Sequence, residues 1–171
     1  LSPSGQPLGI NAGAKVSGRI GDWNLGTLLI NQDGDPATGL ETKNIFVGRA
    51  ALNVLSESQI GLIATEGDPQ SNLDNSLLGA DFRYRNSQLA NGKTIETTGY
   101  FQQTDTEGKS GDDASYGMMI NYPSNQGFNG RYRYKRVEKN FDPAVGFVNQ
   151  SDIEDHALVA NYQHFLTTGG Y

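Results

Sequence analysis

The stretch GFNGRYRYKRVEKNFDPAVGFV, residues 127–148, alternates cations with aromatic residues in an otherwise acidic chain. Cations interleaved with rings suit single-stranded nucleic acid, because cations track phosphates and rings stack on bases. In an extended strand, however, successive side chains point to opposite faces, so the same letters predict a β-strand with one aromatic and one cationic face. The aromatic face has Phe128, Tyr132 and Tyr134, and the cationic face has Asn129, Arg131, Arg133 and Lys135.

Composition favours the strand. The 171 residues fit one domain, and the net charge of −6 disfavours a nucleic-acid partner, since such binding depends on cations that neutralise phosphates. Hydrophobic residues make up 36% of the chain and recur in short clusters, which predicts an ordered, mainly β protein. The absence of cysteine excludes disulfides and thiolate metal sites.

Alternation and turn residues together predict nine strands. Their approximate ranges are 9–20, 23–31, 45–55, 59–66, 76–89, 93–104, 114–122, 127–138 and 155–166. The pattern is clear in the first, fifth, seventh and ninth strands and less clean in the second, third, fourth and sixth. In the first strand, one face has Ile10, Ala12, Ala14, Val16 and Ile20, and the other has Asn11, Lys15, Ser17 and Arg19. In the fifth, Leu78, Ala80, Phe82 and Tyr84 lie opposite Asp81, Arg83 and Arg85.

The connections between these strands alternate in length. Short turns at residues 21–22, 56–58, 90–92 and 123–126 alternate with long loops at 32–44, 67–75, 105–113 and 139–154. Strands that run up and down across a slab collect short turns at one end and long loops at the other, as in outer-membrane barrels. The sequence therefore predicts an all-β fold, an antiparallel up-and-down transmembrane β-barrel or a nine-strand portion of a larger barrel. A soluble β-barrel or sandwich that binds a ligand or carbohydrate is the alternative.

The charged faces of the strands supply the candidate site. In a barrel the apolar stripe faces lipid and the polar stripe faces the interior. The lumen-lining candidates are Arg19, Asp81, Arg83, Arg85, Arg131, Arg133 and Lys135. They form either a structural ion-pair lattice or a selectivity lining, and the lattice is favoured because unpaired charges in a narrow barrel are costly.

Two other groups of residues carry weaker signals. Asp33, Asp35, Asp112 and Asp113 lie in long loops and could hold Ca²⁺, although they lack EF-hand spacing and Asp-Gly turns explain them equally well. His156 and His164, eight residues apart on one predicted strand face, suggest with Ser151 a hydrolase dyad. No Gly-x-Ser-x-Gly elbow is present, so we expect no catalytic residues, no enzyme activity and no cofactor other than this calcium.

Two segments resemble a known family. GAKVSGRIGDWNLGTL, residues 13–28, and EKNFDPAVGFV, residues 138–148, resemble segments of an outer-membrane β-barrel family of unknown function from Gram-negative bacteria. In that family the barrel lies downstream of a family-nine carbohydrate-binding-like domain. The resemblance implies that residues 1–171 are a single barrel domain, a fragment of a longer chain, and the odd strand count agrees, since bacterial single-chain barrels close with an even number.

Together these observations predict a non-enzymatic outer-membrane protein. We expect a porin-like conduit, or a membrane anchor for a surface domain that handles a ligand or carbohydrate, with an outer-membrane hydrolase as a distant third function. The expected partners are outer-membrane lipid and a carbohydrate or small polar solute, with no nucleic acid.

Overall fold

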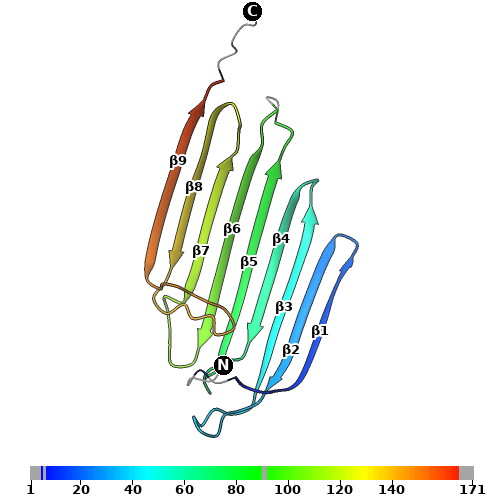
Figure 1. The fold of residues 1–171 in the computed structure, drawn as a ribbon, viewed down its shortest axis with the longest axis vertical. Coiled ribbons are helices and arrows are strands. Elements are labelled where there is room, and N and C mark those ends of the chain that lie inside the picture. Colours follow the sequence, from blue (N-terminus) through cyan, green and yellow to red (C-terminus); the bar gives the residue numbers. More distant parts are fainter. Residues whose placement is uncertain (1–4, 6, 90–91, 166–171) are drawn as a thin grey trace, which may run out of the picture.

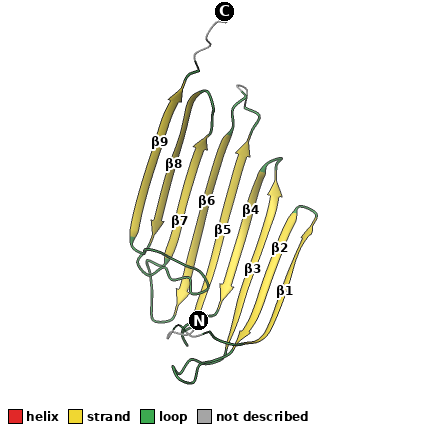
Figure 2. Cartoon of the chain, viewed as in Figure 1, coloured by secondary structure: helices red, strands yellow, loops and turns green. Residues whose placement is uncertain are grey.

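The computed structural model describes residues 5, 7–89 and 92–165, and all nine of its elements are β-strands (Figures 1 and 2). The strands are β1 (Ile10–Ile20), β2 (Trp23–Gln32), β3 (Lys43–Val54), β4 (Ser58–Glu66), β5 (Asn75–Asn86), β6 (Ile95–Thr106), β7 (Ala114–Tyr122), β8 (Gly127–Val137) and β9 (Ile153–Gln163). Within these residues, no helix has the length and apolar character needed to cross a membrane.

The strands form one antiparallel sheet in sequence order, from β1 to β9. Each strand pairs with the next one along the chain, so the predicted all-β, up-and-down fold is confirmed. The sheet is open, and β1 and β9 lie at its two edges (Figure 1). The nine strands therefore form one open wall, which is compatible with part of a barrel.

Two loop classes collect at the two ends of the sheet. At one end, which we call the turn end, the strands are connected by residues 21–22, 55–57, 87–94 and 123–126. At the other end, which we call the loop end, they are connected by residues 33–42, 67–74, 107–113 and 138–152. The regular alternation of length fails at residues 87–94, because β5 stops at Asn86 and β6 starts only at Ile95. This connection is as long as residues 67–74. Residues 90–91 of the predicted turn and residue 166 of the ninth predicted strand lie outside the described part.

The register divides the side chains between two faces. One face, the apolar face, includes Val16, Leu25, Ala50, Leu62, Ala80, Phe101, Met118, Tyr132 and Leu158. The other, the polar face, includes Ser17, Asn24, Arg49, Asp81, Thr98, Gln102, Ser115, Arg133 and Asp155. The faces predicted for the fifth and eighth strands are confirmed.

The first strand departs from its predicted pattern at its start. A register shift between Ile10 and Ala12 places Ile10 opposite Gln32, a residue of the polar face. Asn11 Nδ2 instead donates a hydrogen bond to Asn31 Oδ1 at 3.1 Å. A β-bulge adds one residue to a strand and so reverses the alternation beyond it. The expectation that Ile10 shares the face of Val16 is therefore wrong.

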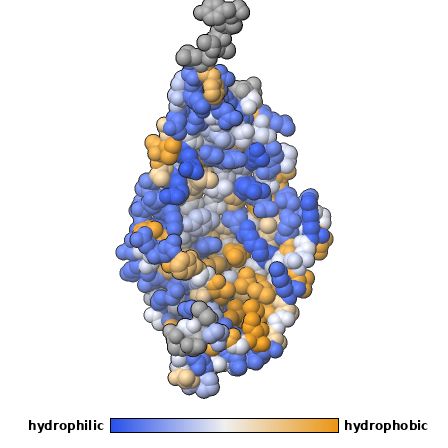
Figure 3. Space-filling model, viewed as in Figure 1, coloured by the Kyte–Doolittle hydropathy of each residue, from blue (hydrophilic) through white to orange (hydrophobic). Residues whose placement is uncertain are grey.

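Burial in this sheet is the reverse of that in a soluble domain. Sixteen of the 22 exposed large hydrophobic side chains of the described residues lie on the apolar face, whereas the small buried cluster of Leu77, Val137 and Phe141 lies on the polar side at the loop end. The face turned toward the viewer in Figure 3 is mostly hydrophilic, and its hydrophobic area lies near the loop end. None of the described residues thus forms a layer packed on the apolar face.

Candidate functional site

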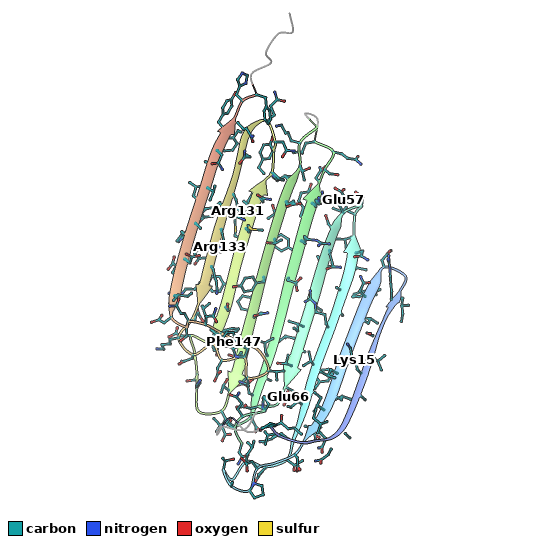
Figure 4. The ribbon with its side chains drawn as sticks, viewed as in Figure 1. Lys15, Glu57, Glu66, Arg131, Arg133 and Phe147 are labelled. Carbon is teal, nitrogen blue, oxygen red and sulfur yellow. The ribbon has the colours of Figure 1, made fainter. Side chains whose placement is uncertain are left out.

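All seven lumen-lining candidates lie on the polar face. They come from three separate parts of the sheet, β1, β5 and β8. Figure 4 labels two of them, Arg131 and Arg133 on β8, and also Lys15, a further cation of the polar face, far from them on β1. The sequence therefore correctly placed these seven residues on one face. Which of their charged groups come into contact depends on the register of the strands.

The best-defined contact on the polar face joins β3 to β5 across the intervening strand. Arg49 Nη2 donates a hydrogen bond to Asp81 Oδ1 at 2.9 Å, and Arg49 Nη1 contacts Asp81 Oδ2. Two parallel N–H···O bonds are the strongest geometry for an arginine–carboxylate pair. Asp81 therefore pairs with Arg49, a residue that was not among the predicted lumen-lining candidates.

Gly61 on β4 makes room for this pair. A Cβ atom at Gly61 would lie 2.6 Å from Arg49 Nη2 and 2.9 Å from Arg49 Cζ, so the guanidinium crosses β4 where no side chain stands. Gly26 on β2, on the same face, offers a matched comparison, because a Cβ atom there would have no neighbouring atom within 4 Å. A side chain at position 61 would thus displace the end of the Arg49 side chain, whereas one at position 26 would displace no neighbouring atom.

We expect Gly61→Ala to be less favourable than Gly26→Ala. Gly26→Ala should stabilise the strand by about 0.5–1 kcal/mol, because alanine loses less backbone entropy on folding than glycine. Gly61→Ala makes the same entropic gain but displaces a partly exposed ion pair, so its effect should be about 0.2–1 kcal/mol less favourable. Urea unfolding measures both. In an Arg49→Ala background the difference between the two substitutions should vanish; a difference that persists there would show that the ion pair is not its cause.

Two further ion pairs use the remaining carboxylates of the polar face. Arg85 Nε lies 3.3 Å from Glu96 Oε1, and Arg133 Nη2 lies 2.7 Å from Asp155 Oδ2. The charged residues of this face therefore form separate cross-strand pairs, and the predicted lattice stays a prediction. Four cations of this face make no hydrogen bond or ion pair with the described residues. They are Lys15, Arg83, Arg131 and Lys135.

A recess opens on the polar face at the turn end. Arg19, Arg83, Arg85, Glu57, Glu96 and Thr98 are among the side chains that line it. Glu57 is held at its edge, since Ser87 donates to it from its hydroxyl at 2.7 Å and from its backbone N–H at 2.9 Å. These two bonds lower the pKa of Glu57. Arg19 is turned toward the 21–22 turn, where its Nε donates to Gly21 O at 2.9 Å.

The NFDPAVGF segment, residues 140–147, folds back over the polar side of the sheet at the loop end. Phe141 is 6% exposed and packs in a cluster with Leu77 and Val137. Phe147, at the place labelled in Figure 4, is 88% exposed. Asn75, 3% exposed, clamps the backbone of the segment. Its Nδ2 donates to Asp142 O at 2.8 Å, and its Oδ1 accepts from Ala144 N–H at 3.2 Å. The NFDPAVGF segment thus anchors the 138–152 loop to the polar side of the sheet.

The apolar face ends in aromatic side chains. Near the turn end these are Trp23, Tyr84, Tyr122, Phe128 and Tyr162, and near the loop end they are Phe46, Tyr116 and Tyr134. Between them lie aliphatic residues such as Leu62, which is 57% exposed. Tyr132 also reaches the loop-end aromatic group, where its hydroxyl lies 2.8 Å from His156 Nδ1.

The two histidines do not form the predicted pair. β9 ends at Gln163, so His164 lies beyond the strand and the expectation that both histidines share one strand face is wrong. His156 lies on the apolar face, where Nε2 is 3.3 Å from Glu154 Oε1. Ser151 lies in the 138–152 loop.

The four aspartates predicted to hold calcium are engaged in loop contacts. Asp33 Oδ1 and Asp35 Oδ1 accept backbone N–H groups of Gly34 and Ala37, at 3.0 and 3.1 Å. Asp113 Oδ1 accepts from Gln103 Nε2 at 3.0 Å, and Asp112 Oδ2 lies 3.0 Å from Lys139 Nζ. Among the described residues no group of three or more His, Asp or Glu side chains is arranged to hold a metal ion. Calcium binding here stays a prediction.

Comparisons with known proteins add no identification. No protein-family model, curated protein or solved structure matches this chain. The resemblance of residues 13–28 and 138–148 to the outer-membrane barrel family therefore stays a prediction.

Proposed function

We propose that this chain forms part of the wall of a β-barrel in the outer membrane of a Gram-negative bacterium. The apolar face would contact lipid, and the polar face would line the interior. The observation that carries the proposal is the continuous exposure of large hydrophobic side chains on one face of a sheet that buries few such residues elsewhere.

The size of the apolar face supports a lipid contact. Nine strands at about 4.8 Å spacing, each crossing about 30 Å, give a face of roughly 1,200 Å². The largest apolar patch on a typical soluble monomer is about 300–600 Å². Leu78 at 67% and Leu158 at 75% exposure illustrate how little of this face is covered. Lipid chains would cover all of it without a partner protein.

The two ends of the apolar face fit the two surfaces of a bilayer. Aromatic residues concentrate at both membrane interfaces, where a ring meets lipid and a hydroxyl or N–H meets water. Beyond the loop-end aromatics the face becomes polar, at residues such as Asn31, Asn44, Glu66 and Asp105. Strands of 9–12 residues match the length of about 9–11 residues that a tilted strand needs to span the hydrocarbon core.

The polar face supports a conduit. Cations and carboxylates distributed over β1 to β9 require water or partners, which a wet barrel interior supplies. The 140–147 segment would narrow this interior at the loop end, which is the end of the sheet that it covers (Figure 1). A membrane anchor for a surface domain that handles a ligand or carbohydrate is compatible with the same wall.

Flotation with phospholipid vesicles tests the proposal. The complete gene product, refolded with vesicles and spun through a sucrose gradient, should float with the lipid and resist extraction by alkaline carbonate. In water without detergent it should aggregate. A monodisperse species that stays soluble without detergent and does not float would contradict the membrane wall and favour a soluble ligand-binding β-barrel or sandwich.

A further inference from the structure

Charge is divided unequally between the polar face and the rest of the molecule. Every Lys, Arg, Asp and Glu of the chain lies within the described residues. Of 13 cations nine lie on the polar face, and of 19 acids only three do, although the net charge of the chain is −6. The nine cations are Lys15, Arg19, Lys43, Arg49, Arg83, Arg85, Arg131, Arg133 and Lys135, and the three acids are Asp81, Glu96 and Asp155.

The other acids concentrate at the loop end. Fourteen of them lie in the loops there or at the adjoining strand ends. They are Asp33, Asp35, Glu41, Glu66, Asp68, Asp74, Asp105, Glu107, Asp112, Asp113, Glu138, Asp142, Asp152 and Glu154. The acidic character of the chain is therefore a property of its rim, and the polar face between the two ends is cationic.

The polar face has more cations than its own carboxylates can pair with. Each of its three carboxylates is matched with one arginine, in the pairs of Arg49, Arg85 and Arg133. Arg83 and Arg131, on β5 and β8, make no ion pair with the described residues, and Lys15 and Lys135 make none either. A structural lattice alone would need as many carboxylates as cations, so the surplus calls for counter-ions from solution.

We infer that the polar face selects small anions, so that the barrel interior conducts them in preference to cations. This inference rests on the proposed membrane barrel. A water-filled passage with low-dielectric walls focuses the field of its lining charges, and rings of Arg and Lys are the usual lining of anion pores. The ligands of this lining are small inorganic or carboxylate anions, chloride being the simplest.

The acidic rim does not cancel this field over most of the passage. Arg131 precedes Glu138 by seven residues along β8, which corresponds to about 23 Å at a strand rise of about 3.3 Å. The Debye length at physiological ionic strength is about 8 Å. The loop-end acids are thus screened at Arg131, and equally at Arg83, which lies nine residues along β5 from Asp74. Two turn-end acids, Asp22 and Glu57, line the same recess as Arg83, but neither forms an ion pair with it.

Planar bilayers test the inference. The complete gene product is reconstituted with a tenfold KCl gradient across the bilayer. The sign of the reversal potential should show that chloride permeates more readily than potassium. Arg83→Gln with Arg131→Gln should lower the chloride-to-potassium permeability ratio by about threefold or more, because two unneutralised lining charges are removed. The matched control, Lys109→Gln with Lys139→Gln, removes two loop-end cations already paired with Asp142 and Asp112 and should leave the ratio unchanged.

The outcomes separate the inference from the proposed barrel. Selectivity for potassium, no selectivity, or equal effects of the two double variants would overturn anion selection. Protein that floats with vesicles but conducts no ions would also overturn it, while the membrane wall would stand. Protein that does not float would remove the barrel and the inference together.

Discussion

Replacing Met118 by arginine should destabilise the protein in phospholipid vesicles by about 2–4 kcal/mol, the cost of a cation on the lipid face of a barrel near the bilayer midplane. Met118 lies in the middle of β7 on the apolar face and is 41% exposed. In a soluble protein a side chain with this exposure would tolerate arginine with little loss. The free energy of unfolding by urea in vesicles measures the effect.

The next residue along the strand provides the control. Met119 points to the opposite face, across from Thr98 and Arg133, and lines the polar recess at the turn end. Met119→Arg should cost less than about 1 kcal/mol, since water reaches this face and added repulsion from neighbouring cations is screened. The two variants thus make the same methionine-to-arginine change at neighbouring positions on opposite faces of β7. Equal small costs for both would contradict contact between Met118 and lipid.

Replacing Phe141 by alanine should cost about 3 kcal/mol, as is typical of removing a buried phenylalanine side chain. Phe141 joins the 138–152 loop to Leu77 on β5 and Val137 on β8. Its loss should also release the loop, so that backbone amides of residues 140–146 exchange with solvent faster. Urea unfolding and hydrogen exchange measured by mass spectrometry check the two effects.

Phe147 offers the matched comparison within the same loop. It is 88% exposed, against 6% for Phe141. Phe147→Ala should change the free energy of unfolding by less than about 0.5 kcal/mol, in line with other surface substitutions. If the two variants were equally destabilised, or if Phe141→Ala left amide exchange in the loop unchanged, the anchoring role of Phe141 would be refuted.

The facing of several strands was predictable because each of them carries its own alternating pattern. In β8 cationic and aromatic residues alternate from Arg131 to Lys135, and the structure places Arg131 and Arg133 on the predicted face. β3 could not be assigned in the same way. Its polar-face positions include Ile45 and Val47 as well as Arg49, because the loop end of this face is apolar. Both faces of β3 are therefore hydrophobic over half its length, and periodicity does not reveal Arg49.

The long-range contacts were hidden for a different reason. The Arg49–Asp81 pair depends on the registers of β3, β4 and β5 and on the missing side chain at Gly61, none of which alternation encodes. Likewise, sequence does not distinguish Phe141 from Phe147, because both are aromatic residues in one long loop. In the structure Asn75 clamps the backbone between them, at Asp142 and Ala144, and this contact joins residues far apart in the sequence.

The direction of the two edge strands limits how the wall can be completed. β1 and β9 both run from the loop end to the turn end (Figure 1). Copies of these nine strands arranged by rotation about a common axis would bring β9 of one copy beside β1 of the next in parallel, which an all-antiparallel barrel does not allow. An antiparallel seam requires an odd number of additional strands in each repeating unit, so rotational assembly of this segment by itself does not produce such a barrel.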